Sequence, residues 1–361
     1  MVAQPLHLGW SNPVRVRWGV GCFQSLTANQ PVVVLADRAA LSQENEAFLI
    51  ERLGAQCRGR IWFHGGLASV EQAQAMCNSI WPVMQDPHTT VLAIGGGSTL
   101  DLAKVLRYRM ANSTEAAAAW RANTLPAGVH RHPLTLVPTT AGTGSEVTRW
   151  ATLWDTAVLQ PGKLSWAPPD GYAEDAYVDA ALTLSCPLRQ TRDSGLDTLA
   201  HALEALWNRN ATPVSDALAL EAARTVLETL PALLKQQDNL DARTAMARAS
   251  LLAGLAMSQT QTALAHALSY DLTLQENMPH GEACAVWLPM VWTLALRASN
   301  PCDAALSRIF GGNAGAGVDH LRVWLYRLGV HARDLHDTPQ GRARLELEMR
   351  SARGRNFIGS H

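Results

Sequence analysis

The stretch TVLAIGGGSTLDLAK (residues 90–104) shows most directly how this chain folds. Residues 91–94 form an unbroken apolar run, which is typical of a strand buried on both faces of a parallel sheet. Three glycines and a serine follow, and an amphipathic helical pattern then continues to about residue 109. A strand, a glycine turn and a helix in this order indicate an α/β protein.

The same alternation continues over the first half of the chain. The expected strands are 13–20 (an edge strand), 32–36, 60–63 and 134–137, and the expected helices are 41–53 and 69–81. From about residue 182 onward almost every segment has a helical pattern, with breaks at prolines such as Pro231. The sequence therefore predicts an α/β domain over residues 1–182 and an all-helical domain over residues 183–361.

Composition excludes several classes of protein. The chain has 361 residues, of which 47% are hydrophobic and 17% charged, as in ordinary globular proteins of two domains. Its formal net charge is −1, so we expect no nucleic acid and no membrane surface as partner. Six cysteines without a CxxC motif, and an N-terminus without signal-peptide features, favour reduced thiols in a cytoplasmic protein.

The glycine turn is a candidate phosphate site. Gly95, Gly96, Gly97 and Ser98 lie where the buried strand passes into the helix. Glycine lets backbone amides approach an anion closely, and a helix N-terminus adds partial positive charge, so a pyrophosphate fits such a turn. The usual GxGxxG fingerprint is absent. A tight turn capped by Ser98 is the alternative interpretation.

A second loop of small and hydroxyl residues follows another buried strand and contains Thr139, Thr140 and Thr143. Two such loops at the carboxyl ends of parallel strands are expected to flank one cleft, where open α/β sheets bind ligands. Asp37, just past the strand at 32–36, is suited to the two hydroxyls of an adenosine ribose. Its charge would repel a 2′-phosphate, which favours NAD over NADP. A turn or cap residue is the alternative role for Asp37.

Four residues in the helical half form a candidate metal site. Asp197 and His201 are four apart in a helical segment, so both side chains leave the same face one turn apart. His266 lies in a second helical segment, and His280 lies in a turn. Such a set can bind a divalent metal and leave a position for substrate, and imidazoles suit iron, zinc and nickel alike. A hydrogen-bonded Asp–His pair and a packed histidine are the alternatives.

Four motifs in this order, GGGSTLDLAK, PTTAGTGSEVT, DSGLDTLAHALE and the stretch from His266 to His280, resemble the iron-containing (group III) alcohol dehydrogenase family. The resemblance covers nearly the whole chain. It implies an α/β dinucleotide-binding domain followed by an all-helical metal-binding domain, a fold shared with dehydroquinate synthase and glycerol dehydrogenase. The implied metal ligands are Asp197, His201, His266 and His280, with Fe(II) expected and zinc as the alternative. The implied cofactor positions are Asp37, Gly95, Gly96, Gly97, Ser98, Asp101, Lys104, Thr139, Thr140, Thr143 and Lys163.

Two positions depart from the family's pattern. Tyr270 stands where most members have another histidine near the nicotinamide, and His64-Gly65-Gly66-Leu67 replaces an Asn-Pro pair. Tyr270 is therefore a candidate proton donor, with water relayed through the ribose hydroxyls as the alternative. The string from His266 to Tyr270, together with Arg149, resembles a subgroup that includes phosphonoacetaldehyde reductases.

The expected activity is hydride transfer between a nicotinamide cofactor (NAD, with NADP as the alternative) and a small aldehyde or alcohol. The subgroup resemblance makes phosphonoacetaldehyde, reduced to 2-hydroxyethylphosphonate, the finer expectation. Arg149, Arg189 and Arg192 are candidates for binding an anionic substrate group, with surface ion pairs as their alternative role. A lyase of the dehydroquinate synthase type and a non-catalytic metal or nucleotide binder are the competing functions. By resemblance, a homodimer or larger homo-oligomer is expected.

Overall fold

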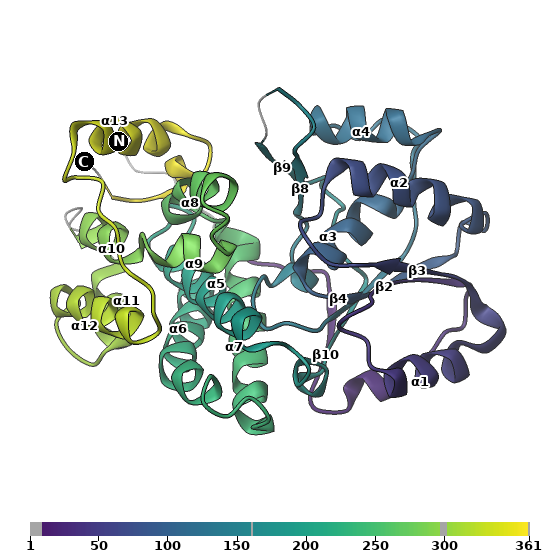
Figure 1. Cartoon of the computed structure of the whole chain (residues 1–361), viewed down its shortest axis with the longest axis horizontal. Coiled ribbons are helices and arrows are strands. Elements are labelled where there is room, and N and C mark those ends of the chain that lie inside the picture. The colour runs from purple at the N-terminus through teal and green to yellow at the C-terminus, as the bar shows by residue number, and fades with distance from the viewer. Residues whose placement is uncertain (1–8, 160–161, 297–301, 360–361) are drawn as a thin grey trace.

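The computed structural model describes residues 9–159, 162–296 and 302–359. Its first half contains one sheet of six parallel strands in the order β1-β10-β7-β4-β2-β3, with helices on both faces (Figure 1). The strands are β1 (Arg15–Trp18), β2 (Val32–Asp37), β3 (Cys57–Phe63), β4 (Thr90–Gly95), β7 (Leu134–Pro138) and β10 (Asp175–Val178). Since β1 lies at one end of the sheet, the predicted edge strand is confirmed.

Strand β2 shows why the sheet is buried on both faces. Val32 and Val34 belong to the core that includes residues of helix α1, whereas Val33 and Leu35 belong to the core on the opposite face. Successive side chains of a strand point to opposite faces, so an unbroken apolar run supplies both cores. The covering helices are α1 (Gln43–Leu53) on one face and α2 (Val70–Ile80), α3 (Gly97–Leu106) and α4 (Ser113–Arg121) on the other (Figure 1).

Several short elements lie outside the sequence expectations. Helix α3 ends at Leu106, before the expected residue 109, because strand β5 (Tyr108–Arg109) pairs antiparallel with β6 (His130–Arg131). An antiparallel hairpin of β8 (Ala151–Asp155) and β9 (Gly162–Trp166) follows the second loop. Strand β9 of this hairpin carries Lys163, one of the predicted cofactor residues.

The second half of the described chain is helical, which confirms the expected order of an α/β part followed by an all-helical part. Its core is built mainly from alanine and leucine on the inner faces of α5 to α8. The helices are α5 (Leu188–Leu206), α6 (Pro213–Leu233), α7 (Leu240–Thr260), α8 (Leu264–Gln275), α9 (His280–Ala285), α10 (Leu288–Leu296), α11 (Cys302–Ile309), α12 (Ala314–Arg327) and α13 (Pro339–Arg350). Among the described residues, we find no helix with the length and hydrophobicity that crossing a membrane requires.

The helix break expected near Pro231 is confirmed, because α6 ends at Leu233, two residues later. Proline lacks an N–H group and cannot bond the carbonyl four residues earlier. That carbonyl, on Leu227, instead accepts a hydrogen bond from the indole Nε1 of Trp324 at 3.0 Å. A residue of α12 therefore satisfies the group that proline leaves free, and α6 continues to Leu233.

The second loop joins the two halves closely. The Thr198 hydroxyl on α5 lies 3.2 Å from the Ala141 carbonyl oxygen and 3.3 Å from that of Gly142. Gly144 has φ of +60°, and a Cβ there would lie 2.5 Å from the Cα of Gly254 on α7, so only glycine permits this approach. The cofactor-loop candidate and the helix of Asp197 are thus fixed to each other. We retain residues 1–182 and 183–361 as the proposed domain division.

Candidate active site

Helix α5 supplies one wall of the site. Asp197 and His201 project from the same face, as their spacing predicts, and their Oδ1 and Nε2 atoms lie 3.7 Å apart. Both residues are buried, at 4% and 6% exposure. Asp197 Oδ1 has no hydrogen-bond donor among the described residues. Because a buried carboxylate oxygen without a donor is costly, this arrangement favours a bound cation over a simple Asp–His hydrogen bond.

Helix α8 brings the third ligand into place. His266 Nε2 lies 3.5 Å from Asp197 Oδ1, and its ring stacks on that of His201 with centroids 4.7 Å apart. His266 is 2% exposed, and its Nε2 also lacks a hydrogen-bond partner within the described chain. Two unpartnered ligand atoms from different helices therefore face the same point.

Glu204, on α5, fixes the orientation of His266. Its carboxylate is fully buried and accepts hydrogen bonds from the backbone N–H groups of Ala263 (2.6 Å), Ala265 (2.5 Å) and His266 (3.2 Å). It also contacts His266 Nδ1 at 2.7 Å. An anion at the N-terminus of α8 is favourable, and the Nδ1 proton donated to it leaves the Nε2 lone pair free for a metal.

Helix α9 completes the cluster. His280 is its first residue, and ligand atoms of Asp197, His266, His280 and Cys284 all lie within 4.8 Å of one another. The Sγ of Cys284, one turn after His280, is 4.0 Å from His280 Nε2. Gly281 permits this geometry, because a Cβ there would overlap the Asp193 carbonyl oxygen on α5.

The electrostatics of these groups follow from burial and proximity. Burial alone would raise the pKa of Asp197, but the imidazoles of His201 and His266 outweigh it and hold that pKa well below its usual range. Burial lowers the pKa of His201 to about 4, against the attraction of Asp197. Burial and then Lys163 lower the pKa of His280 well below its ordinary value. Neutral imidazoles beside an ionised carboxylate are the protonation states that a metal ion needs in its ligands.

The exception is His266. Burial would lower the pKa of this histidine, but Cys284 and Glu204 raise it well above its ordinary value. A cation is therefore favoured at this point of the cluster. A proton or a metal ion can supply the charge, and the lack of a donor at Asp197 Oδ1 makes the donor set suitable for a metal.

Lys163 reaches this cluster from the α/β part. Its ammonium lies 3.5 Å from His280 Nε2 and 4.8 Å from the centroid of the Tyr270 ring. The Tyr270 hydroxyl is buried without a hydrogen-bond partner in the described chain, and burial raises its pKa. Arg353, from the C-terminal segment, lies 5.7 Å from the same ring. The two cations, the phenol and the metal ligands therefore share one site between the halves of the molecule.

The two loops predicted for the cofactor lie side by side, because β4 and β7 are neighbouring parallel strands. The Thr139 N–H donates to the Gly95 carbonyl at 3.0 Å. Gly96 is the N-cap of α3, and a Cβ on Gly97 would lie 2.5 Å from Thr143 Cγ2. A Cβ on Gly96 would lie 3.4 Å from Thr140 Cγ2, an ordinary contact, and Ser98 is the partly exposed second residue of α3. The amide end of a ten-residue helix and a hydroxyl-rich loop thus lie at the same edge of the sheet.

Two further predicted cofactor residues, Asp101 and Lys104, form hydrogen bonds within the protein. Asp101 accepts hydrogen bonds from the Ser145 hydroxyl at 2.7 Å and from the Thr152 N–H at 2.9 Å. Lys104 is 1% exposed, and its ammonium donates to Ser145 Oγ and to the Trp150 carbonyl, both at 2.7 Å. Both side chains hold the second loop against α3, which positions the loop for any ligand.

Asp37 lies at the carboxyl end of β2, partly exposed, and its Oδ1 accepts the Ala39 N–H at 2.9 Å. The turn role considered for Asp37 is therefore present. The neighbouring cation, Arg38, pairs with Glu46 at 2.7 Å and lies over the Trp62 ring. Glu46 also pairs with Arg60 at 3.4 Å, so one carboxylate serves two guanidiniums at this corner.

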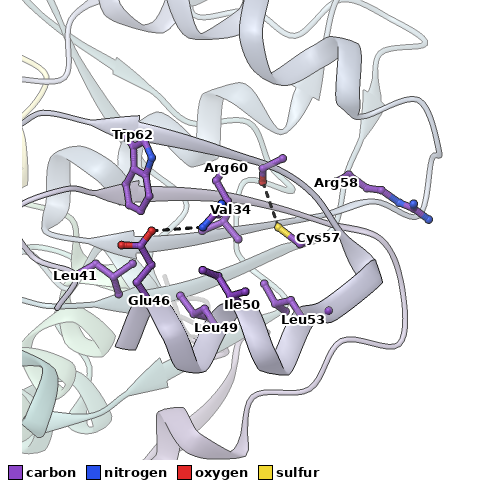
Figure 2. A pocket seen from close by; sticks show the side chains of 12 residues that line it. Val34, Leu41, Glu46, Leu49, Ile50, Leu53, Cys57, Arg58, Arg60 and Trp62 are labelled. Carbon is purple, nitrogen blue, oxygen red and sulfur yellow. Dashed lines mark hydrogen bonds and ion pairs between the residues drawn. The ribbon is translucent and has the colours of Figure 1, made fainter. Parts of the chain in front are cut away.

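None of the contacts described for the three arginines proposed for an anionic substrate is with a proposed metal ligand. Arg149 packs over Trp150 and lines a separate pocket with Tyr172, Ser258 and Gln261; of the described residues there, none is a metal ligand. Arg192 forms an ion pair with Glu282, and Arg189 is exposed. Another groove, between α1 and edge strand β3, is spanned by the Glu46–Arg60 ion pair and has no predicted site residue among those described (Figure 2).

Sequence reasoning missed Glu204, Cys284 and Arg353. Glu204 follows Asp197 by seven positions and His201 by three, so helical periodicity places it on the ligand face. Cys284 follows His280 by four positions, the same spacing as the Asp197–His201 pair. No comparable signal exists for Arg353, because only the folding of the C-terminal segment brings it to Tyr270.

The structure thus joins a parallel sheet with two juxtaposed carboxyl-edge loops to helices that bear a cluster of carboxylate and imidazole groups. Residues 13–171 match the family model described as iron-containing alcohol dehydrogenase, and residues 191–336 match the C-terminal model of the Fe-containing alcohol dehydrogenase family. The chain belongs to the iron-containing alcohol dehydrogenase family.

Named relatives and solved structures agree with this assignment. Long-chain-alcohol dehydrogenase 1 of Geobacillus thermodenitrificans is 37% identical over 225 residues, which cover 62% of this chain and 56% of the relative. Sulfoacetaldehyde reductase of Bilophila wadsworthia is 35% identical over 55% of this chain and 50% of its own length. The chain thus aligns with about half the length of these curated relatives.

The structural likeness extends further along the chain. Sulfoacetaldehyde reductase from Bifidobacterium kashiwanohense, solved in complex with NAD+, matches 97% of this chain and 94% of its own, with a TM-score of 0.84 and 25% identity. The iron-containing alcohol dehydrogenase from Thermotoga maritima matches 98% of this chain and 96% of its own, with a TM-score of 0.76 and 26% identity. The expected family and fold are therefore confirmed.

Proposed function

We propose that this protein reduces a small aldehyde to an alcohol with NADH, and catalyses the reverse reaction, in a metal-dependent manner. The observation that carries the proposal is the cluster of buried ligand atoms, in which Asp197 Oδ1 and His266 Nε2 lack partners in the described chain. When bound, NADH supplies the hydride and a divalent metal withdraws electron density from the aldehyde oxygen.

Asp197, His201, His266 and His280 are the proposed metal ligands, and Cys284 offers a further donor atom beside them. Oxygen and imidazole donors accept either Fe(II) or Zn(II). The family membership supports iron. A nearby thiol is a softer donor that suits zinc, so metal identity is a question for elemental analysis of anaerobically purified protein.

The cofactor is proposed to lie along the two loops at the carboxyl edge of β4 and β7. Gly95, Gly96, Gly97 and Ser98 would hold the pyrophosphate, with Thr139, Thr140 and Thr143 beside it. Asp37 would bind the ribose hydroxyls through the oxygen that does not accept the Ala39 N–H. The negative charge of Asp37 supports NAD rather than NADP, because it would repel a 2′-phosphate. Asp101 and Lys104 act by holding the second loop, and Lys163 lies at the metal end of the cofactor path.

Reduction also requires a proton on the product oxygen. Tyr270 is the proposed donor because its hydroxyl is buried and lacks a partner among the described residues, and because its ring lies against the Lys163 ammonium. Water relayed through the ribose hydroxyls is the alternative route. Replacing Tyr270 with phenylalanine separates the two: a large loss of kcat with unchanged metal content supports Tyr270, whereas unchanged kcat supports the relay.

The finer substrate proposal is phosphonoacetaldehyde, which would be reduced to 2-hydroxyethylphosphonate. It is supported by the similarity of the chain to sulfoacetaldehyde reductases, which are named for another two-carbon aldehyde with a tetrahedral anionic group. Arg149 remains a candidate for that group, although its contacts lie in a separate pocket.

The deciding experiment follows NADH and NADPH oxidation with neutral, carboxylated, sulfonated and phosphonated aldehydes, using protein loaded with Fe(II) or Zn(II) after chelation. We expect one NADH consumed per aldehyde and no turnover by the metal-free protein. Cofactor recycling without net NADH consumption would instead identify a lyase, and cofactor binding without turnover on any aldehyde would identify a binding protein.

A further inference from the structure

Two cations lie against one aromatic ring beside the metal ligands. Lys163 Nζ is 4.8 Å and Arg353 Cζ is 5.7 Å from the centroid of Tyr270. Lys163 comes from the β8–β9 hairpin of the α/β part, whereas Arg353 comes from the segment after α13. Residues from opposite ends of the fold therefore meet at the candidate substrate position.

Neither cation forms an ion pair with a carboxylate in the described part of the chain. The Lys163 ammonium lies 3.5 Å from His280 Nε2, and the Arg353 guanidinium donates a hydrogen bond to the Thr262 hydroxyl. Other cations of this region are neutralised: Lys104 lies 3.6 Å from Asp101, and Arg192 pairs with Glu282. Two close cations without a counter-ion are unfavourable, and an anion brought by a ligand would relieve their repulsion.

Arg353 is held firmly in this position. Asn356 Nδ2 donates to the Thr262 carbonyl at 2.9 Å, and the Arg209 N–H donates to the Asn356 carbonyl at 2.7 Å. Phe357 is 1% exposed in the helical core. These contacts fix the backbone just after Arg353, so ordering of the Arg353 guanidinium on ligand binding should cost little further conformational entropy.

We propose that Arg353, together with Lys163, binds a tetrahedral anionic head group on the aldehyde substrate. The proposal rests on the function proposed above, because the head group is placed relative to a carbonyl at the metal ligands. A guanidinium fork matches two oxygens of a phosphonate or sulfonate, and the lysine adds a point charge. Arg353 would thus set substrate specificity, a role that sequence reasoning gave to Arg149.

The test compares Arg353→Ala with Arg355→Ala, a matched control on the same segment whose side chain is exposed. The substrates are phosphonoacetaldehyde, sulfoacetaldehyde and the neutral propionaldehyde. Arg353→Ala should lower kcat/KM for the preferred anionic aldehyde by roughly 10- to 150-fold, mainly through KM, as loss of a hydrogen bond to a charged group does. Propionaldehyde should change little, Arg355→Ala should change neither, and Arg353→Lys should restore part of the loss.

An equal loss on all three aldehydes, or no loss on any, would overturn the proposal. The preference between the two anionic aldehydes identifies the head group.

A second measurement needs no turnover. Methylphosphonate and methanesulfonate, titrated into the metal-loaded, NADH-bound protein by calorimetry, should bind the wild type and the Arg355→Ala variant but not Arg353→Ala. If no aldehyde is reduced yet one of these anions still binds through Arg353, the proposed function fails and the anion site stands. If neither anion binds the wild type, the anion site fails whatever the activity. Metal content and NADH affinity, measured alongside, show that Arg353→Ala is folded.

Discussion

The cofactor loops and the metal cluster of this protein are built in different ways. The loops follow two neighbouring strands, β4 and β7, and meet because parallel strands end at the same edge of a sheet. The proposed metal ligands come from three helices, α5, α8 and α9, and meet only because those helices pack closely. A change in a loop should therefore act locally, whereas a change in the cluster should act through its neighbours.

The largest expected effect is the loss of His266, the ligand at the centre of the cluster. His266→Ala should abolish metal retention and turnover together while NADH still binds, because the side-chain contacts described for His266 are with Glu204 and the other proposed ligands, not with the loops. Elemental analysis measures the metal content of the variant, and fluorescence titration measures its affinity for NADH. His331→Ala, at an exposed histidine, is the control. Normal activity in a metal-depleted His266→Ala protein would contradict the metal-dependent mechanism.

Glu204→Gln tests whether the cluster depends on residues that do not face the metal. The amide can still accept from the backbone of α8 but cannot hold the His266 Nδ1 proton as a carboxylate does. Metal affinity should fall roughly 10- to 100-fold, the usual effect of losing such a partner. Competition with a chromophoric chelator measures it, with the exposed Glu221→Gln as control. Unchanged affinity would show that packing alone orients His266.

Gly97→Ala tests the other side of the comparison. The new Cβ would lie 2.5 Å from Thr143 Cγ2, which forces the two loops apart at a cost of about 1–3 kcal/mol. NADH affinity should fall while metal content stays normal, the reverse of the His266→Ala result. Gly312→Ala, where a Cβ meets open space, is the control. Loss of metal together with NADH affinity would show that loops and cluster are coupled.

The smallest expected effect is a pH dependence confined to the α/β part. Burial lowers the pKa of His132 to about 4, and its Nδ1 contacts the Thr89 carbonyl at 3.1 Å. Between pH 6.5 and about 4, His132 is protonated in the unfolded chain but stays neutral in the folded chain. The free energy of unfolding therefore falls as the pH drops through this range.

Titration of His132 changes the free energy of unfolding by at most about 1.4 kcal/mol per pH unit. His132→Asn keeps a donor for Thr89 but does not titrate, so its unfolding free energy should depend less steeply on pH than that of the wild type over this range. Chemical denaturation at several pH values compares the two slopes. Equal slopes would place the acid sensitivity elsewhere in the chain.

Much of the fold was predictable because its signals are local. The apolar runs at 32–36 and 91–94, and the helical spacing of Asp197 and His201, depend only on strand and helix geometry. The hairpin that carries Lys163 has no such periodic signal. Pro231 gave a local signal for the end of α6, but the carbonyl that it leaves free is satisfied by Trp324, far away in the sequence.

The sequence by itself determined the α/β-then-helical order, the glycine and threonine loops, and the four residues proposed as metal ligands. These follow from spacing within single elements, and from motifs whose order resembles one family. Only the tertiary structure decided that Glu204 orients His266, that Cys284 joins the ligands, and that Lys163 and Arg353 meet at Tyr270. Spacing along one helix can place Glu204 and Cys284 on the faces of Asp197 and His280, but which groups they contact depends on how distant segments pack.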